Sequence, residues 1–148
     1  MHLRFLLRRL SMFPLLMLSL LLLAGCDETP TGRSQLALIP EHLMAQMGED
    51  TFEQLRRDQP ISRSAPVNRQ VQCVAREIVA AAEAIYPNAD LPDTWEIAVF
   101  EDPSPNAFAL PGGRIGVHTG LLDVAENSAQ LAAVIGHEVG HVLADHGN

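Results

Sequence analysis

Hydrophobic residues recur at helical spacing in three stretches of the chain. In residues 67–85 the steps between them are four, three, four, three and four, and the positions are Val67, Val71, Val74, Ile78, Ala81 and Ile85. This spacing predicts a helix with one continuous apolar face. A second helix is predicted over residues 41–57, with Leu43, Met44, Met47, Phe52 and Leu55 on one side. Pro40 suits its first turn, and Gly48 is a candidate interruption.

The third helical stretch begins at Asn127, a residue type that caps helices, with Gln130 three positions later as in a capping box. Its apolar residues at helical spacing are Leu131, Val134, Ile135, Val142 and Leu143. Gly136 and Gly140 lie inside this helix, and each costs about 1 kcal/mol relative to alanine. We therefore expect a neighbouring backbone to pack closely against both glycines.

Between the helical stretch at residues 67–85 and the one that begins at Asn127, the hydrophobic period changes to two. This alternation predicts a strand over residues 95–100, a short strand with a turn over 106–113 and a further strand over 114–119, and a helical turn over 120–124 follows them. In the last strand Ile115 and Val117 share one face, and His118 lies opposite, in a structural or solvent-facing position. The predicted fold class is α+β, mainly helical with a small sheet of two to three short strands.

The third helix contains the sequence His137-Glu138-Val139-Gly140-His141. On a helix the two histidines are one turn apart and about 40° from eclipsed, so both imidazoles can reach a single ion. Glu138 is turned about 100° from His137, which suits a base that holds a water better than a third ligand. By chance the pattern arises in roughly a few per thousand chains of this length, so it favours a metal site that hydrolyses a bond.

The N-terminus has the features of a secretory signal over residues 1–25. Arg4, Arg8 and Arg9 precede an apolar run that is too short to span a bilayer comfortably. The run ends in Leu23-Ala24-Gly25-Cys26, which resembles the bacterial lipoprotein box, in which the cysteine is acylated. The alternative is an ordinary signal peptide followed by a stray cysteine.

The remaining chain divides into a polar tether at residues 26–34 and one small domain at 35–148. After Gly25 there are 18 acidic and 7 basic residues, a net charge of −11 that argues against a nucleic-acid partner. If Cys26 carries lipid, Cys73 is the one thiol left, and we expect it to be buried. The competing possibility is a disulfide to a residue outside this chain.

Four segments occur in an order that resembles a known family of enzymes. They are Thr31-Gly32-Arg33-Ser34-Gln35-Leu36, residues 106–113, Val117-His118-Thr119-Gly120-Leu121-Leu122, and residues 137–147. The order is similar to that in the HtpX and BepA-like zinc metallopeptidases, which also include the CAAX prenyl proteases. Within that family the chain looks most like the periplasmic lipoprotein members, which act on misassembled envelope proteins.

The resemblance implies a zincin-like metalloendopeptidase with one Zn²⁺ per chain. His137 and His141 would bind the zinc, and Glu138 would be the general base that activates water for attack on a peptide carbonyl. The strand Arg114-Ile115-Gly116-Val117-His118 would be an edge that holds an extended substrate by main-chain hydrogen bonds. The implied substrates are unfolded or misassembled envelope proteins.

The implied location is the periplasmic side of a bacterial membrane, to which an acylated Cys26 would anchor the protein. Asp27 resembles the residue that retains lipoproteins at the inner membrane of enteric bacteria, so it weakly favours that membrane.

The chain departs from the family pattern at its end. The family's third zinc ligand is a glutamate on a later helix, followed four residues on by an aspartate, and no such helix follows Asn148 in this sequence. His146 is about 140° round the helix from His141 and points away from the ion, and Asp145 lies one turn too far along. The chain is therefore interpreted as the N-terminal portion of the domain. The alternative is a non-catalytic periplasmic lipoprotein, a truncated pseudopeptidase that binds envelope partners.

Overall fold

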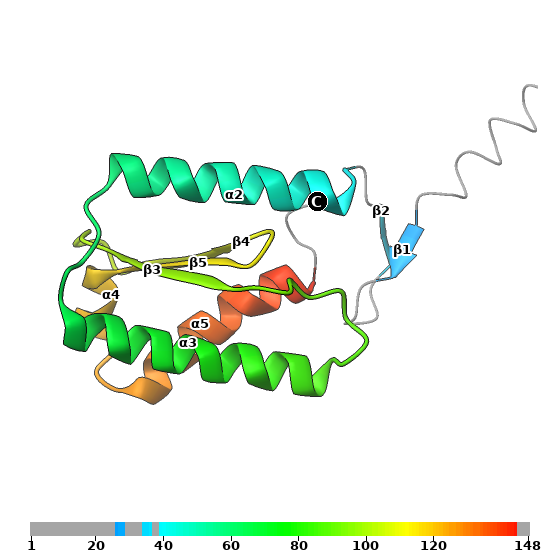
Figure 1. Ribbon diagram of the computed structural model, residues 1–148. Coiled ribbons are helices and arrows are strands. Elements are labelled where there is room, and N and C mark those ends of the chain that lie inside the picture. Colours follow the sequence, from blue (N-terminus) through cyan, green and yellow to red (C-terminus); the bar gives the residue numbers. More distant parts are fainter. Residues whose placement is uncertain (1–25, 29–33, 37–38, 145–148) are drawn as a thin grey trace, which may run out of the picture.

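The computed structural model describes residues 26–28, 34–36 and 39–144, and Figure 1 shows a sheet with helices on both faces. The strands of the sheet are β3 (Glu96–Phe100), β4 (Ala107–Leu110) and β5 (Arg114–His118). Helix α2 (Glu41–Asp58) covers one face, α3 (Ala65–Ile85) and α5 (Ser128–Leu143) cover the other, and α4 (Thr119–Val124) joins β5 to α5. The predicted α+β class, mainly helical with a small sheet, is confirmed.

The order of strands in the sheet is β3-β5-β4, so β5 is the central strand. Val117 pairs with Val99 of parallel β3 on one side and with Ala107 of antiparallel β4 on the other. The prediction that residues 114–118 form an edge is therefore wrong. Alternation along a strand shows which side chains are buried, but it carries no information about which strands lie on either side.

Each face of the sheet has its own core, because alternate side chains of β5 point in opposite directions. Ile115 and Val117 are fully buried among apolar residues of α3 and α5. On the α2 face, Phe52 packs edge-on against Phe100, with ring centroids 6.0 Å apart. Gly116 also lies on this face, where an added Cβ would be 2.1 Å from the Phe108 ring, so the strand needs glycine there.

Helix α2 runs without a break through Gly48, so the predicted interruption is absent. Gly48 is buried against the turn between β4 and β5, and a Cβ at this position would be 2.1 Å from the carbonyl oxygen of Pro111. Met44 and Phe52 are buried as predicted, whereas Leu43 and Met47 are exposed. The helix therefore uses a narrower apolar face than the hydrophobic pattern indicated.

Helix α3 buries a face that is rotated from the predicted one, although Val71 is buried and Val67, Val74 and Ile78 pack partly buried against the core as predicted. The buried residues are Val71, Ala75, Val79 and Ala82, while Ala81 and Ile85 are exposed. Cys73 lies on nearly the opposite side of the helix from this stripe and is exposed, so the prediction of its burial is wrong. Alanines carry little hydrophobic signal, but they allow α5 to pack closely.

At the start of the chain, β1 (Cys26–Glu28) and β2 (Ser34–Leu36) pair as an antiparallel ribbon within and just beyond the predicted tether. Among the described residues, no helix is both long and apolar enough to cross a membrane. The predicted signal segment 1–25 lies outside the described residues.

Candidate active site

Helix α5 is positioned by its N-terminal cap and by its buried stripe. The side-chain oxygen of Asn127 accepts hydrogen bonds from the backbone N–H groups of Ala129 and Gln130, both at 3.0 Å. The Gln130 side chain in turn accepts from the N–H of Glu126 at 2.8 Å, one residue earlier than a standard capping box. The stripe is made of Leu131, Ile135, Val139 and Leu143. The predicted cap is confirmed, and the buried stripe determines which side of α5 carries the histidines.

His137 and His141 converge on one point. Their Nε2 atoms are 3.1 Å apart, with the ring centroids 4.5 Å apart and the ring planes at 78°. Two imidazole nitrogens that bind one tetrahedral zinc at about 2.05 Å would be roughly 3.3 Å apart. His137 is exposed and His141 is half-buried, so solvent can reach the pair. The observed separation fits two ligands of a single ion.

Glu138 follows His137 directly, so it is turned about 100° from that histidine around the helix, and it is half-buried. Within the part of the chain that the structure describes, no group of three His, Cys, Asp or Glu side chains gathers to hold a metal. The described residues therefore supply two candidate ligands and one candidate base. His146 and Asp145, which the sequence argument rejected as ligands, lie outside the described residues.

The sheet edge that borders α5 is β4. His118 donates its backbone N–H to the carbonyl of Asn106 at 3.0 Å. In an antiparallel pair the bonded residues alternate, so Ala107 and Ala109 direct their main-chain N–H and C=O groups away from β5. Ala107 is buried in the same core as Val139 of α5, which holds this edge beside the helix that carries His137 and His141.

The residues of β5 that were predicted to hold substrate have structural roles instead. Arg114 makes ion pairs with Glu49 of α2 at 3.6 Å and with Glu96 of β3 at 3.7 Å, and donates to the carbonyl of Gly112 at 2.7 Å. Ile115, Gly116 and Val117 are enclosed by the two cores.

Residues 65–148 match the family model for Peptidase family M48. The chain belongs to this family. It is 38% identical over 124 residues to the mitochondrial metalloendopeptidase OMA1 of Arabidopsis thaliana, a match that covers 84% of this chain and 23% of the relative. The match to metalloendopeptidase OMA1 of Danio rerio is 33% identical over 129 residues and covers 84% of this chain and 27% of the relative. The family assignment agrees with the resemblance seen in the sequence motifs.

The chain is also similar to a bacterial M48 protein. It is 27% identical over 101 residues to the beta-barrel assembly-enhancing protease of Escherichia coli, a match that covers 68% of this chain and 20% of the relative. The chain thus spans only about a fifth to a quarter of the length of these M48 relatives.

The sequence analysis did not predict a polar cluster at the end of β5, which is formed by Asp102, Ser104 and His118. Ser104 donates its hydroxyl and its backbone N–H to Asp102 at 2.6 and 2.8 Å, and its Oγ lies 2.7 Å from Nδ1 of His118. These hydrogen bonds from Ser104, and then the nearby His118, lower the pKa of the Asp102 carboxyl. The spacing Asp-x-Ser is a turn signal that could have indicated it.

This cluster clamps a loop and does not form a catalytic relay. A relay needs a histidine that contacts its acid and its nucleophile through different ring nitrogens, whereas Nδ1 of His118 faces both Ser104 and Asp102. His118 is buried, with the rings of Phe100 and Phe108 edge-on against it. The structural role predicted for His118 is confirmed.

The sequence predicts that a neighbouring backbone packs closely against Gly136 and Gly140 of α5. Among the described residues neither glycine has such a contact. A Cβ added at Gly136 would lie 3.8 Å from the side chain of Ile78, which is an ordinary contact. A Cβ at Gly140 would meet nothing within 4 Å among the described residues. The prediction of close backbone packing is wrong within the described part of the chain.

Proposed function

We propose that this M48 protein is a zinc-dependent endopeptidase that hydrolyses unfolded or misassembled polypeptides. The observation that carries the proposal is the convergence of two imidazole nitrogens, 3.1 Å apart, on a helix inside the matched family region. Glu138 is on the same rigid helix, and an open strand edge runs beside it. Together these parts supply metal binding, a base and a surface for an extended chain.

His137 and His141 would hold the zinc, with a third ligand from outside the described residues. When bound, zinc supplies a Lewis acid that polarises a peptide carbonyl and lowers the pKa of water. Glu138 would take the proton from the attacking water and pass it to the leaving amine. Its place on the helix that carries both histidines would keep the carboxylate at a constant position relative to them.

We assign the substrate edge to β4 in place of β5. The outward N–H and C=O groups of Ala107 and Ala109 would bond to a substrate backbone as an added antiparallel strand. Recognition of this kind reads the main chain, so cleavage would depend weakly on side chains. This is the behaviour expected of a peptidase that removes misassembled proteins of different sequences.

We also propose that the protein works in the bacterial envelope, anchored through an acylated Cys26 and facing the periplasm. Support comes from the run Leu23-Ala24-Gly25-Cys26 after an apolar segment. The relatives named beta-barrel assembly-enhancing proteases are in keeping with such a role, whereas the OMA1 relatives are named as mitochondrial. Asp27 favours the inner membrane, as in enteric lipoproteins.

The metal part of the proposal is tested by titrating the purified protein with zinc in competition with a chromophoric chelator. The expected result is one zinc per chain, with His137→Ala lowering the affinity by at least about tenfold. His42→Ala is the matched control, because His42 is an exposed histidine on α2. Equal zinc affinity in all three proteins would contradict the assignment.

The role of β4 is tested with peptide substrates that carry N-methyl groups at successive backbone positions. An antiparallel strand uses alternate N–H groups, so methylation should lower kcat/KM about five- to tenfold at every second position and have little effect between them. A uniform response along the peptide would refute the β4 assignment. Binding of these peptides without any cleavage would support the pseudopeptidase alternative.

A further inference from the structure

Two large apolar side chains of α2 are left on the surface. Leu43 is 42% exposed and Met47 is 56% exposed, although the hydrophobic pattern predicted both for the core. The two residues are four positions apart, so they lie one turn apart on the same side of the helix. Together they form the apolar flank of α2.

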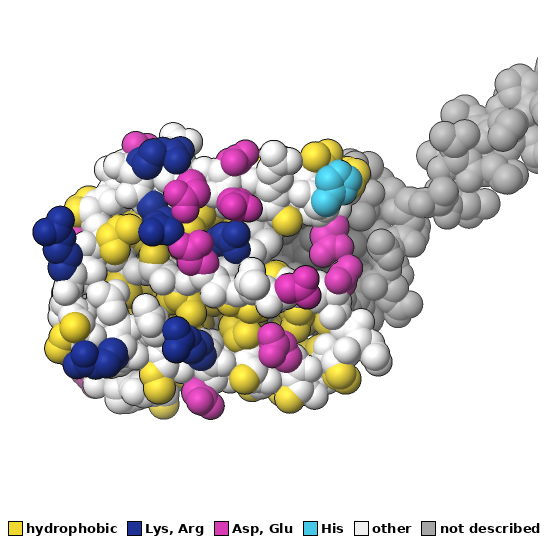
Figure 2. All heavy atoms as spheres, in the orientation of Figure 1, with side chains coloured by type: hydrophobic (Ala, Val, Ile, Leu, Met, Phe, Trp, Pro, Cys, Tyr) yellow, Lys and Arg dark blue, Asp and Glu magenta, His cyan; other side chains and the backbone are white. Residues whose placement is uncertain are grey.

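The ion pairs of α2 show toward which strand this flank points. On the other side of the helix, Glu49 pairs with an arginine of β5 and Arg56 pairs with a glutamate of β3. Figure 2 shows acidic and basic side chains gathered along α2 on the face in view. Met47 is about 160° round the helix from Glu49, and the buried residues of α2 lie between them. Because the strand order is β3-β5-β4, the apolar flank lies on the β4 side of the helix.

Two side chains of β4 extend the apolar flank of α2. Phe108 and Leu110 lie on the α2 face of the sheet, where they pack against the core that contains Phe52 and Phe100. Both are half-buried, so part of each side chain remains accessible. On its α2 face, the open edge of β4 is therefore bordered by apolar side chains from both the helix and the strand.

The hydrogen-bonding pattern of β4 determines where the side chains of a bound strand would lie. Substrate residues opposite Ala107 and Ala109 would exchange main-chain hydrogen bonds with them. The residues between would direct their N–H groups away from β4 and place their side chains on the α2 face, opposite Phe108 and Leu110. In an antiparallel pair, residues opposite each other at such positions bring their side chains closest together. Every second substrate side chain would thus meet the apolar surface.

We propose that Leu43 and Met47 are specificity determinants, which select apolar side chains at every second position of a polypeptide bound along β4. This inference rests on the proposed peptidase function and names the substrate class. That class is extended segments with accessible apolar side chains, which a folded protein mostly buries and an unfolded one exposes. The main-chain contacts of β4 accept any sequence, and the apolar flank adds a preference to them.

The test is fluorescence anisotropy with two labelled, unstructured peptides that carry either leucine or serine at every second position. The background is Glu138→Gln, so that neither peptide is cleaved. In this protein the leucine peptide should bind at least about tenfold more tightly, because several leucines are partly buried at once. Adding Leu43→Gln and Met47→Gln, which keep a high helix propensity, should reduce the difference to about threefold or less. Phe108 and Leu110 would account for the remainder.

The placement of the leucines is tested with N-methyl groups in the leucine peptide. N-methylation of the leucines should have little effect, whereas N-methylation of the residues between them should lower the affinity about five- to tenfold. This alternation separates binding along β4 from unspecific contact between apolar groups. Equal effects at both sets of positions would overturn the proposal. Failure of both peptides to bind, as expected if a second copy of this chain covers the edge, would also overturn it.

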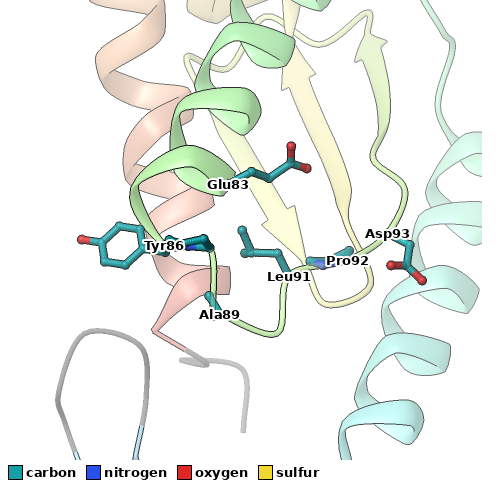
Figure 3. A pocket seen from close by; sticks show the side chains of 7 residues that line it. Glu83, Tyr86, Ala89, Leu91, Pro92 and Asp93 are labelled. Atoms are coloured by element: carbon teal, nitrogen blue, oxygen red, sulfur yellow. The ribbon is translucent and has the colours of Figure 1, made fainter.

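The matched control adds Ile85→Gln and Val124→Gln, which remove two other exposed apolar side chains. Neither residue belongs to α2 or β4, and Ile85 directly precedes Tyr86, which lines a separate hollow at the end of α3 (Figure 3). This control should keep the preference for the leucine peptide, and an equal loss of preference in both double variants would contradict the role of the apolar flank. Because binding is measured without turnover, an absence of hydrolysis by the wild type would refute the peptidase function alone.

Discussion

Two helix glycines should respond to alanine with opposite signs, because their neighbours differ. In a helix interior, replacing glycine by alanine gains about 1 kcal/mol of helix propensity. At Gly136 the new Cβ would make only ordinary contacts, at 3.8 and 3.9 Å from Ile78, so most of that gain should remain. At Gly48 the new Cβ would be 2.1 Å from the carbonyl oxygen of Pro111.

The contact at Gly48 is with backbone that has little freedom to move. Pro111 is followed by Gly112 and Gly113, both with φ of 77°, in the tight turn between β4 and β5. Helix α2 would have to move outward by roughly 1 Å, and such overpacking costs up to about 3 kcal/mol. After the propensity gain of about 1 kcal/mol, the expected net loss of stability for Gly48→Ala is about 2 kcal/mol.

Urea denaturation followed by circular dichroism measures both effects. With an m value of about 2 kcal/mol/M, Gly48→Ala should lower the midpoint by about 1 M, and Gly136→Ala should raise it by up to about 0.5 M. The two variants serve as controls for each other, since both make the same change inside a helix. A Gly48→Ala protein as stable as the wild type would refute the packing of α2 on the β4–β5 turn.

Asn127→Ala should destabilise α5 by about 1 kcal/mol and lower the melting temperature by about 4–8 °C, whereas Ser128→Ala, which retains the cap, should change it little. The pKa of Asp102 is lowered in the folded state, so its stabilisation should be present at neutral pH and lost as the pH falls below about 4. Asp102→Asn should therefore be less stable than the wild type in urea at pH 7, and the gap should narrow as the pH falls below about 4; a gap that stays constant over the whole acid range would contradict this. Cys73 should react with a thiol reagent in the folded protein as fast as in urea, and strong protection would contradict its exposure.

Local features of the fold could be predicted from the sequence because they depend on neighbours along the chain. The cap at Asn127, the strand periods and the spacing of His137 and His141 all involve residues a few positions apart. For that reason the third helix, the approach of the two imidazoles on it and the short strands were predicted correctly.

Features that depend on distant parts of the chain could not be predicted. The central position of β5 follows from how β3 and β4 pack against it, which no residue of β5 encodes. Cys73 was expected in the core because an unpaired thiol needs a partner or burial, but the buried face of α3, which includes Ala75 and Ala82, lies on nearly the opposite side of the helix.

The measurement that tests the central claim most directly compares the wild type with Glu138→Gln for zinc content and for hydrolysis of an unfolded protein such as casein. The carboxylate is assigned as the base and not as a ligand. The predicted result is therefore one bound zinc in both proteins, with hydrolysis by the variant lower by about a hundredfold or more. Hydrolysis by Glu138→Gln at the wild-type rate, or loss of its zinc, would contradict the role that we assign to this helix.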